Sequence, residues 1–253
     1  MSSERAARLT TINSARIARR LCVAAWLAPW FALVGLAIYP VSTNATRLGS
    51  LVCVATLWGG GLLLFWEKRT VRYALLAFAI ALACLLVLPG RESDSAAMRR
   101  AYVESLAKYE GTRYVWGGES RFGIDCSGLV RRGLVNADFK EGLATANPKP
   151  LREAASLWWH DTSASGLLAG YDGRTRDVLD APSINELDHT RLLPGDIVVT
   201  ADGLHTMAYT GDETWIEADP NPGRVVSVRA PSNVVWFKVP VRVMRWRQFE
   251  GNN

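Results

Sequence analysis

Long apolar runs alternate with short polar segments in the first third of the chain. The runs cover residues 21–39, 49–66 and 73–88. A helix that crosses a bilayer needs about 20 apolar residues and can manage with about 17. A signal peptide would end in a small-residue cleavage site, but none follows the first run and two more runs come after it. The pattern therefore predicts a three-helix transmembrane anchor at residues 21–89, after a tail at residues 1–20.

Beyond a short polar linker at residues 90–94, the pattern is that of one globular domain, residues 95–253. It predicts a helix from Ser95 to about Tyr109 and a second helix that follows a Gly-rich loop near residue 125. The later residues alternate as strands do. These strands cover residues 196–200, 205–210, 214–218, 224–229 and 234–246. Helices first and strands second predict an α+β domain with an antiparallel sheet.

Residues 138–190 interrupt this regular pattern. They are rich in Asp, Asn, Pro, Ser and Gly, and only residues 150–159 suggest a short helix. We expect an insert in this range, and long loops are often lids or binding loops. It contains Trp158, Trp159 and His160. Two interpretations stay open: the tryptophans cover the core, or the insert narrows a groove and selects substrates.

Charge predicts the orientation of the anchor. Residues 1–90 hold nine of the 29 Lys/Arg and two of the 24 Asp/Glu, so the chain's net charge of +5 comes from this region. The tail is rich in arginine, Lys68, Arg69 and Arg72 follow the second run, and the connection after the first run has only Arg47. The positive-inside rule places the tail in the cytoplasm and the domain outside it. The slightly acidic domain argues against a nucleic-acid partner.

Cys126 is the only cysteine after residue 90, since the others are Cys22, Cys53 and Cys84. Structural cysteines outside the cytoplasm normally form disulfides, so a lone one there suggests a reactive thiol. Its predicted place in the first turn of a helix favours the anionic, nucleophilic thiolate. A buried structural thiol is the alternative.

A thiolate nucleophile needs a base, and the chain has three histidines, His160, His189 and His205. His205 opens a predicted strand that turns near Gly211. A turn centred there would place residues 205 and 217 opposite each other, and opposed side chains lie on one face of a sheet. Glu217 could then accept a ring N–H of His205 and orient the imidazole. Asp219, on the same face, competes for this role.

Four stretches occur in the order of one known family. They are Tyr114-Val-Trp-Gly-Gly118, Gly123-Ile-Asp-Cys-Ser-Gly-Leu-Val130, Leu193-Pro-Gly-Asp-Ile197, and His205 with its hairpin. In these stretches the chain resembles the NlpC family of cell-wall cysteine endopeptidases. The resemblance implies a papain-like α+β fold and hydrolysis of peptidoglycan stem peptides at a γ-D-glutamyl–diamino acid bond. It implies no metal and no cofactor.

The resemblance also implies roles for single residues. Cys126 matches the family's nucleophile and His205 its base. Glu217 stands where the family has a polar residue, often histidine, and a carboxylate there should favour a Cys⁻/His⁺ pair. Tyr114 matches a groove residue. Asp125 and Ser127 match residues that bind the substrate's free amine in some members, although helix capping would explain them equally well.

Two other functions remain open. A papain-like thiol acyl hydrolase or acyltransferase could act on lipid or lipoprotein close to the anchor. The third is a non-catalytic cell-wall-binding module, in which Glu217 would be a sign that the catalytic site has decayed. The intact Cys126 and His205 argue against this function. The leading expectation is a multi-pass protein of the bacterial inner membrane with a periplasmic catalytic domain.

Overall fold

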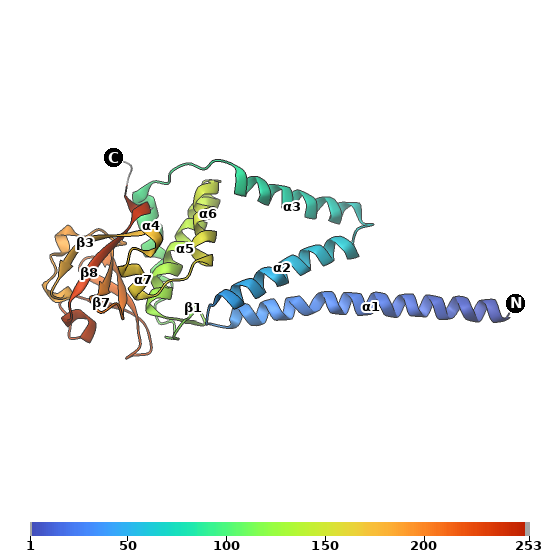
Figure 1. Ribbon diagram of the computed structural model, residues 1–253, viewed down its shortest axis with the longest axis horizontal. Coiled ribbons are helices and arrows are strands. Elements are labelled where there is room, and N and C mark those ends of the chain that lie inside the picture. The colour runs from blue at the N-terminus through green and yellow to red at the C-terminus, as the bar shows by residue number, and fades with distance from the viewer. Residues whose placement is uncertain (1, 251–253) are drawn as a thin grey trace. The chain divides into compact units, whose positions relative to one another are not determined.

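The computed structural model describes residues 2–250, without the side chains of residues 2–16, 18 and 19. The chain divides into two compact units, coloured along the sequence in Figure 1. The first contains Met1–Tyr39 and Ala45–Leu85, and the second contains Pro40–Asn44 and Leu86–Asn253. The connection between the first two long helices therefore belongs to the same unit as the C-terminal domain.

The first unit is built from helices α1 (Ser2–Ile38), α2 (Asn44–Leu64) and α3 (Arg69–Val87). The segments Arg20–Ile38, Asn44–Leu64 and Arg69–Val87 are long and apolar enough to cross a membrane. The three predicted apolar helices are thus present. The predicted tail continues α1, and its arginines at positions 5, 8, 16 and 19 lie outside the described side chains.

Close contact between α1 and α2 depends on a glycine. Trp26 donates a hydrogen bond from Nε1 to the Leu57 carbonyl oxygen at 2.8 Å. A Cβ at Gly60 would lie 2.3 Å from the Trp26 ring, so only glycine leaves room for the indole. Trp26 and Phe65 then meet edge to face with ring centroids 5.9 Å apart, a favoured arrangement for aromatic pairs.

Four helices belong to the second unit. They are α4 (Ser95–Ala107), α5 (Cys126–Ala144), α6 (Pro148–Trp159) and α7 (Ala164–Leu168). Asp94 caps α4 by accepting the Ala96 N–H at 3.0 Å. Met98, Tyr102 and Leu106 recur every four residues on α4 and are buried, as the sequence pattern predicts.

The sheet has six strands, each antiparallel to its neighbours, in the order β3-β8-β4-β5-β6-β7. The strands are β3 (Thr175–Ala181), β4 (Ile197–Thr200), β5 (Thr206–Gly211), β6 (Thr214–Asp219), β7 (Arg224–Arg229) and β8 (Val241–Trp246). The predicted α+β class is confirmed. The predicted strand 234–246 begins only at Val241, because a 3₁₀ turn (Val235–Lys238) and Pro240 come first.

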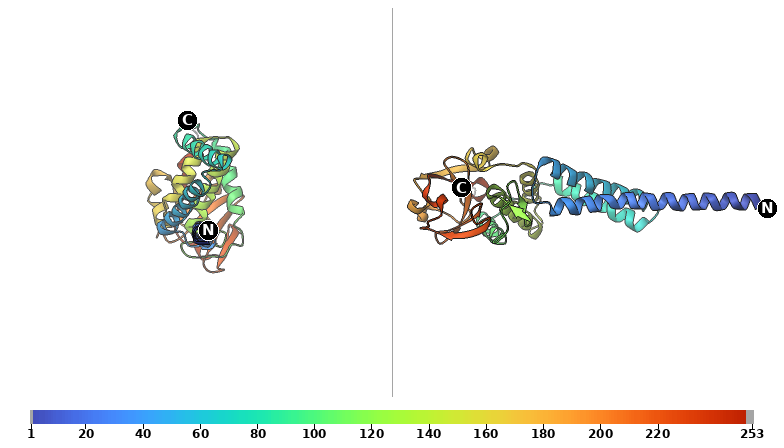
Figure 2. Two further views of the ribbon diagram at one scale, coloured as in Figure 1. Left: turned by 90° about the vertical axis from the view of Figure 1, so that its right-hand side faces the viewer. Right: turned by 90° about the horizontal axis from the view of Figure 1, so that it is seen from below.

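Two clusters of buried side chains cover the two faces of this sheet. Ile197, Ala208 and Ile216 belong to the cluster that contains the helix residues, whereas Met207 and Trp215 belong to the other. This is the period-two alternation of strands. Figure 1 shows α5 beside the sheet and α6 beside α5, and Figure 2 shows the same unit from two further sides.

The expected irregular insert at residues 138–190 is mostly regular structure. Helix α5 continues to Ala144, α6 fills residues 148–159, and β3 adds an edge strand. The predicted short helix at residues 150–159 is present as α6, which starts two residues earlier, at Pro148, after the Asn147 cap. Leu157 and Leu167, from this range, are buried in the core.

Candidate active site

The nucleophile candidate lies where a two-stranded hairpin meets α5. Strands β1 (Glu119–Ser120) and β2 (Gly123–Ile124) form this hairpin, and Cys126 is the first residue of α5. Asp125 caps the helix: its carboxylate accepts the Gly128 N–H at 2.6 Å and the Gly117 N–H at 2.7 Å. The Cys126 side chain is therefore held in the first turn, where the helix dipole favours an anion.

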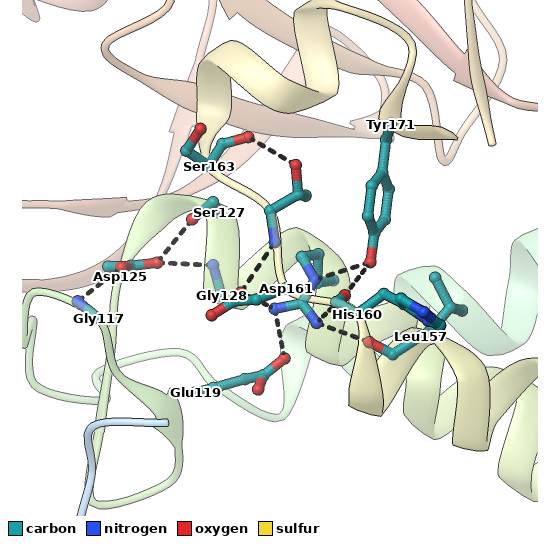
Figure 3. Close-up of polar contacts among 12 residues, drawn as sticks. Gly117, Glu119, Asp125, Ser127, Gly128, Leu157, His160, Asp161, Ser163 and Tyr171 are labelled. Atoms are coloured by element: carbon teal, nitrogen blue, oxygen red, sulfur yellow. Dashed lines mark hydrogen bonds and ion pairs between the residues drawn. The ribbon is translucent and has the colours of Figure 1, made fainter. Parts of the chain in front are cut away.

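Asp125 and Ser127 take part in this cap. The Ser127 hydroxyl donates to Asp125 Oδ1 at 3.1 Å, as Figure 3 shows. Burial raises the pKa of Asp125, while its hydrogen bonds with the backbone and with Ser127 oppose that rise. The capping interpretation of both residues thus has a structural basis, and their role in substrate binding stays a prediction.

The base candidate and its partner form a buried pair on the sheet. His205 precedes β5, and its Nε2 lies 2.6 Å from Glu217 Oε2 on β6. The two side chains are 2% and 0% exposed. With Nε2–H donated to the carboxylate, Nδ1 is the ring nitrogen left for the Cys126 thiol.

The predicted register of this hairpin is wrong by two residues. Ala208 pairs with Ile216, so continuing the ladder places Glu217 opposite Met207. The register shifts between Tyr209 and Gly211, near a turn in which Asp212 and Glu213 have positive φ. His205 and Glu217 nevertheless share one face, so they meet diagonally across the ladder.

Burial and two neighbouring groups shift the pKa of His205 in opposite directions. Burial lowers its pKa, but hydrogen bonds with Cys126 and Glu217 and the charges of both partners raise it to about 9. Burial also raises the pKa of Glu217, and the bond with His205 works against that rise. The net rise in the pKa of His205 favours the cationic imidazole at neutral pH.

Trp236, which the sequence analysis did not single out, covers the imidazole. Its ring stacks on His205 with centroids 4.3 Å apart and planes at 16°. Its Nε1 donates to Asp219 Oδ1 at 3.2 Å. Asp219 thus contacts Trp236, whereas Glu217 makes the hydrogen bond to His205. Trp236 lies in a stretch that the sequence pattern predicts as part of a strand, so nothing in its neighbouring residues indicates a place at the site.

Tyr114 lies beside the same group of charges. Burial raises its pKa to about 12, with smaller contributions from the charges of Cys126, Asp125 and Asp219. Its backbone N–H donates to the Gly223 carbonyl at 2.7 Å, which ties the segment before the hairpin to the loop before β7. The predicted groove residue and the cysteine are therefore neighbours.

Arg131 was also missed, and it links α5 to the α6–α7 region. This 1% exposed side chain donates to Asp161 Oδ1 at 2.6 Å and to the Leu157 carbonyl at 2.6 Å, and it pairs with Glu119 at 2.9 Å. Figure 3 labels the partners Glu119, Leu157 and Asp161 near Tyr171. An arginine one turn after the cysteine thus fixes the cysteine helix to the hairpin and to α6.

The side chains of residues 158–160 differ in their burial. Trp158 is partly buried and packs against the core, while Trp159 is 38% exposed. His160 is exposed, with Nδ1 at 2.9 Å from the Ser156 carbonyl. The core interpretation therefore holds for Trp158. His189 accepts a bond from Trp215 Nε1 at 3.2 Å, a packing role.

Comparisons with known proteins identify the family of this chain. A model of the NlpC/P60 family matches residues 111–245, more than half of the chain. The match contains the hairpin, Cys126, His205 and Glu217. The curated protein "Probable endopeptidase NlpC" of Escherichia coli (strain K12) is 26% identical over 153 residues, which are 58% of this chain and 78% of that protein.

Two solved structures are also similar. The peptidoglycan hydrolase RipB from Mycobacterium tuberculosis is 18% identical with a TM-score of 0.40, over 85% of this chain and 94% of that one. NlpC2 from Trichomonas vaginalis is 20% identical with a TM-score of 0.38, over 61% of this chain. The match spans 49% of that second structure, about half its length.

Proposed function

This chain belongs to the NlpC/P60 family, and we propose that it is a membrane-anchored cysteine peptidase that cuts stem peptides of peptidoglycan. One observation carries the proposal. Cys126 begins a helix within reach of His205, which in turn is bonded to the buried Glu217 at 2.6 Å. All three residues lie within the family match. A nucleophile, a base and an orienting group are what acyl transfer through a thioester requires.

The proposed reaction starts from the Cys126 thiolate and the His205 imidazolium. The sulfur attacks the peptide carbonyl and forms a tetrahedral oxyanion. Its collapse breaks the C–N bond, and His205 gives its proton to the leaving amine. The neutral imidazole then takes a proton from water, which attacks the thioester and releases the acid and the thiolate.

Glu217 is proposed to orient the imidazole and stabilise its cation. Its carboxylate is buried, so a cationic His205 gives it a partner that neutralises its charge. Tyr114 is proposed to line the substrate groove. Asp125 and Ser127 are proposed to bind the substrate in addition to capping α5, and the scissile bond is proposed to be γ-D-glutamyl–diamino acid.

The three apolar helices are proposed to anchor the enzyme in the bacterial inner membrane. Basic residues of the N-terminal tail and the α2–α3 connection favour the cytoplasm for both. Three crossings then place the catalytic domain in the periplasm, where peptidoglycan lies. Attaching green fluorescent protein or alkaline phosphatase after residue 250 tests this, because only the phosphatase needs the periplasm. Fluorescence without phosphatase activity would reverse the proposed orientation.

Digestion of purified muropeptides tests the activity. The full chain in detergent should shorten stem peptides, and mass spectrometry of the fragments identifies the bond. Cys126→Ala is the matched control, because it removes the sulfur from a side chain that is already buried. Identical chromatograms for both proteins would remove the endopeptidase proposal.

A thiol acyl hydrolase or acyltransferase is the second candidate. The short connection between the apolar α3 and the catalytic unit favours it, because that connection keeps the unit near the anchor. Vesicles of phosphatidylethanolamine and phosphatidylglycerol should then release fatty acid with the wild type and not with Cys126→Ala. Fatty acid released equally by both proteins, or by neither, would exclude it.

A further inference from the structure

The connection between α1 and α2 forms backbone hydrogen bonds with the hairpin that precedes Cys126. The Ser42 N–H donates to the Gly117 carbonyl at 2.9 Å, and the Glu119 N–H donates to the Pro40 carbonyl at 3.0 Å. Between them, Val41 pairs with Gly118 as an antiparallel bridge. Residues 40–42, here called the 40–42 segment, therefore lie against the start of the hairpin through one isolated β-bridge.

Glycines of the hairpin make room for this segment. A Cβ at Gly117 would lie 3.3 Å from Val41 Cγ1, and Gly117 has φ of +70°, which favours glycine. A Cβ at Gly123 would lie 2.9 Å from the Pro40 Cβ. Two glycines of the cysteine motif thus face the 40–42 segment as well as the hairpin itself.

The pairing partner of the segment is in direct contact with the cysteine helix. The Gly118 carbonyl accepts the Asp125 N–H at 3.1 Å, and a Cβ at Gly128 would lie 2.2 Å from the same oxygen. The neighbouring Gly117 donates its N–H to the Asp125 carboxylate that caps α5. One peptide unit of the hairpin therefore separates the 40–42 segment from the first turn that carries Cys126.

We propose that residues 40–42 are positioning residues for Cys126: by completing the hairpin, they fix the Gly117–Gly118 peptide against the start of α5. The inference rests on the proposed function, because it assigns the segment to the same thiol. The segment acts through its backbone hydrogen bonds to Gly117 and Glu119. The linker between the first two apolar helices thereby becomes part of the catalytic unit.

Ser42→Pro tests the proposal in the full chain in detergent, with Ser42→Ala as the matched control. Proline removes the N–H that bonds Gly117, whereas alanine keeps it. We expect Ser42→Pro to lower kcat about tenfold at a nearly unchanged KM, because small misplacements of a reacting group are costly. Ser42→Ala should match the wild type.

Alkylation of Cys126 by iodoacetamide provides a readout that needs no substrate. Mass spectrometry of the Cys126 peptide follows its rate against pH, with the peptides of Cys22, Cys53 and Cys84 as internal references. Ser42→Pro should slow the reaction of Cys126 alone and shift its pH dependence. If Cys126 of the wild type is alkylated normally but the protein cuts no muropeptide, the proposed function fails. The alkylation rates of the variants then still decide the positioning role.

Val41→Ala keeps both backbone hydrogen bonds and serves if Ser42→Pro does not fold. It removes the Val41 methyl groups that face Gly117, so a smaller fall of about threefold in kcat is expected. Wild-type kcat and wild-type alkylation in the folded variant, Ser42→Pro or Val41→Ala, would overturn the proposal. A lower melting temperature with unchanged kcat and alkylation would also overturn it, because the segment would then only add stability.

Discussion

Cys126 and His205, the two reacting groups of the candidate site, are held by contacts of different range along the chain. The loop before Cys126 is fixed by Asp125, whose partners Gly117, Ser127 and Gly128 lie within eight residues of it. His205 bonds Glu217 twelve residues later on another strand. It also stacks on Trp236, which lies beyond β7. The nucleophile is placed by a local motif and the base by the sheet.

This difference implies different sensitivities. A cap is a set of hydrogen bonds to neighbouring backbone groups, so its loss should cost stability as well as geometry. The His205 pair is a buried charge arrangement, so its loss should alter protonation first. Substitutions on the sheet side should therefore change pH profiles, and those on the loop side should change melting temperature.

Replacing the base should have the largest effect. His205→Asn keeps a polar side chain of smaller size but cannot carry a proton to the leaving amine, so kcat/KM should fall about 10³-fold. His160→Asn, on an exposed histidine, is the matched control and should leave kcat/KM unchanged. Steady-state kinetics with a defined muropeptide measure kcat/KM for both variants. A loss below tenfold in His205→Asn would assign the base elsewhere.

Removing the charge of Glu217 should have the next effect. Burial lowers the pKa of His205, and Cys126 and Glu217 together raise it to about 9; Glu217→Gln keeps the shape but withdraws the carboxylate contribution. His205 then loses its proton at lower pH, so the alkaline limb of kcat should move toward neutrality and kcat should fall about 10- to 100-fold.

The pH profile of kcat measures this change directly. Glu213→Gln, half exposed on the same hairpin and paired with Arg229, is the control and should keep the wild-type profile. An alkaline limb that stays in place in Glu217→Gln would end the orienting role of Glu217. Asp219→Asn would then be the next variant to measure.

Loss of the cap should have an intermediate effect, mainly on stability. Asp125→Ala removes the acceptor of three hydrogen bonds, so the free energy of unfolding should fall by about 2 kcal/mol. Asp94→Ala removes the single capping bond of α4 and should cost about 1 kcal/mol without loss of activity. Urea unfolding followed by circular dichroism measures both. Equal losses in the two variants would contradict the special importance of the Asp125 cap.

The smallest effect is expected at Trp236. Trp236→Phe keeps an aromatic ring over His205 but removes the N–H that bonds Asp219, so kcat should change by less than about threefold. Trp159→Phe, on a partly exposed ring, is the control. A shift of the alkaline limb as large as that of Glu217→Gln would give Asp219 a direct influence on His205.

The sequence predicts the local half of this arrangement well. The Gly-rich loop, the capping Asp125 and the periodic residues of α5 are adjacent along the chain, so Cys126 is recognisable without tertiary information. The apolar helices and most strands follow from run length and alternation. The family motif adds His205, and the twelve-residue spacing to Glu217 keeps both on one face even though the predicted register is wrong.

Non-local features escape sequence reasoning for identifiable reasons. Trp236 and Arg131 reach their partners only through the tertiary fold, and their neighbours in sequence resemble ordinary strand and helix residues. The edge strand β3 lacks clear alternation because its register with β8 shifts between Asp177 and Leu179. Outside the predicted short helix, the expected irregular insert at residues 138–190 is wrong because capping residues such as Asn147 and Ser163 have the composition of a loop.

The place of residues 40–44 in the catalytic unit also bears on the order in which the protein is made. Their partners Gly117–Glu119 are synthesised only after all of α2 and α3. Synthesis is slow compared with local helix formation, so both helices can form before this pairing exists. The 40–42 segment thus contacts the hairpin beside Cys126 only late in synthesis, although it precedes α2 in the chain. A nascent chain that stops before residue 117 contains the 40–42 segment but lacks the residues to which this segment bonds.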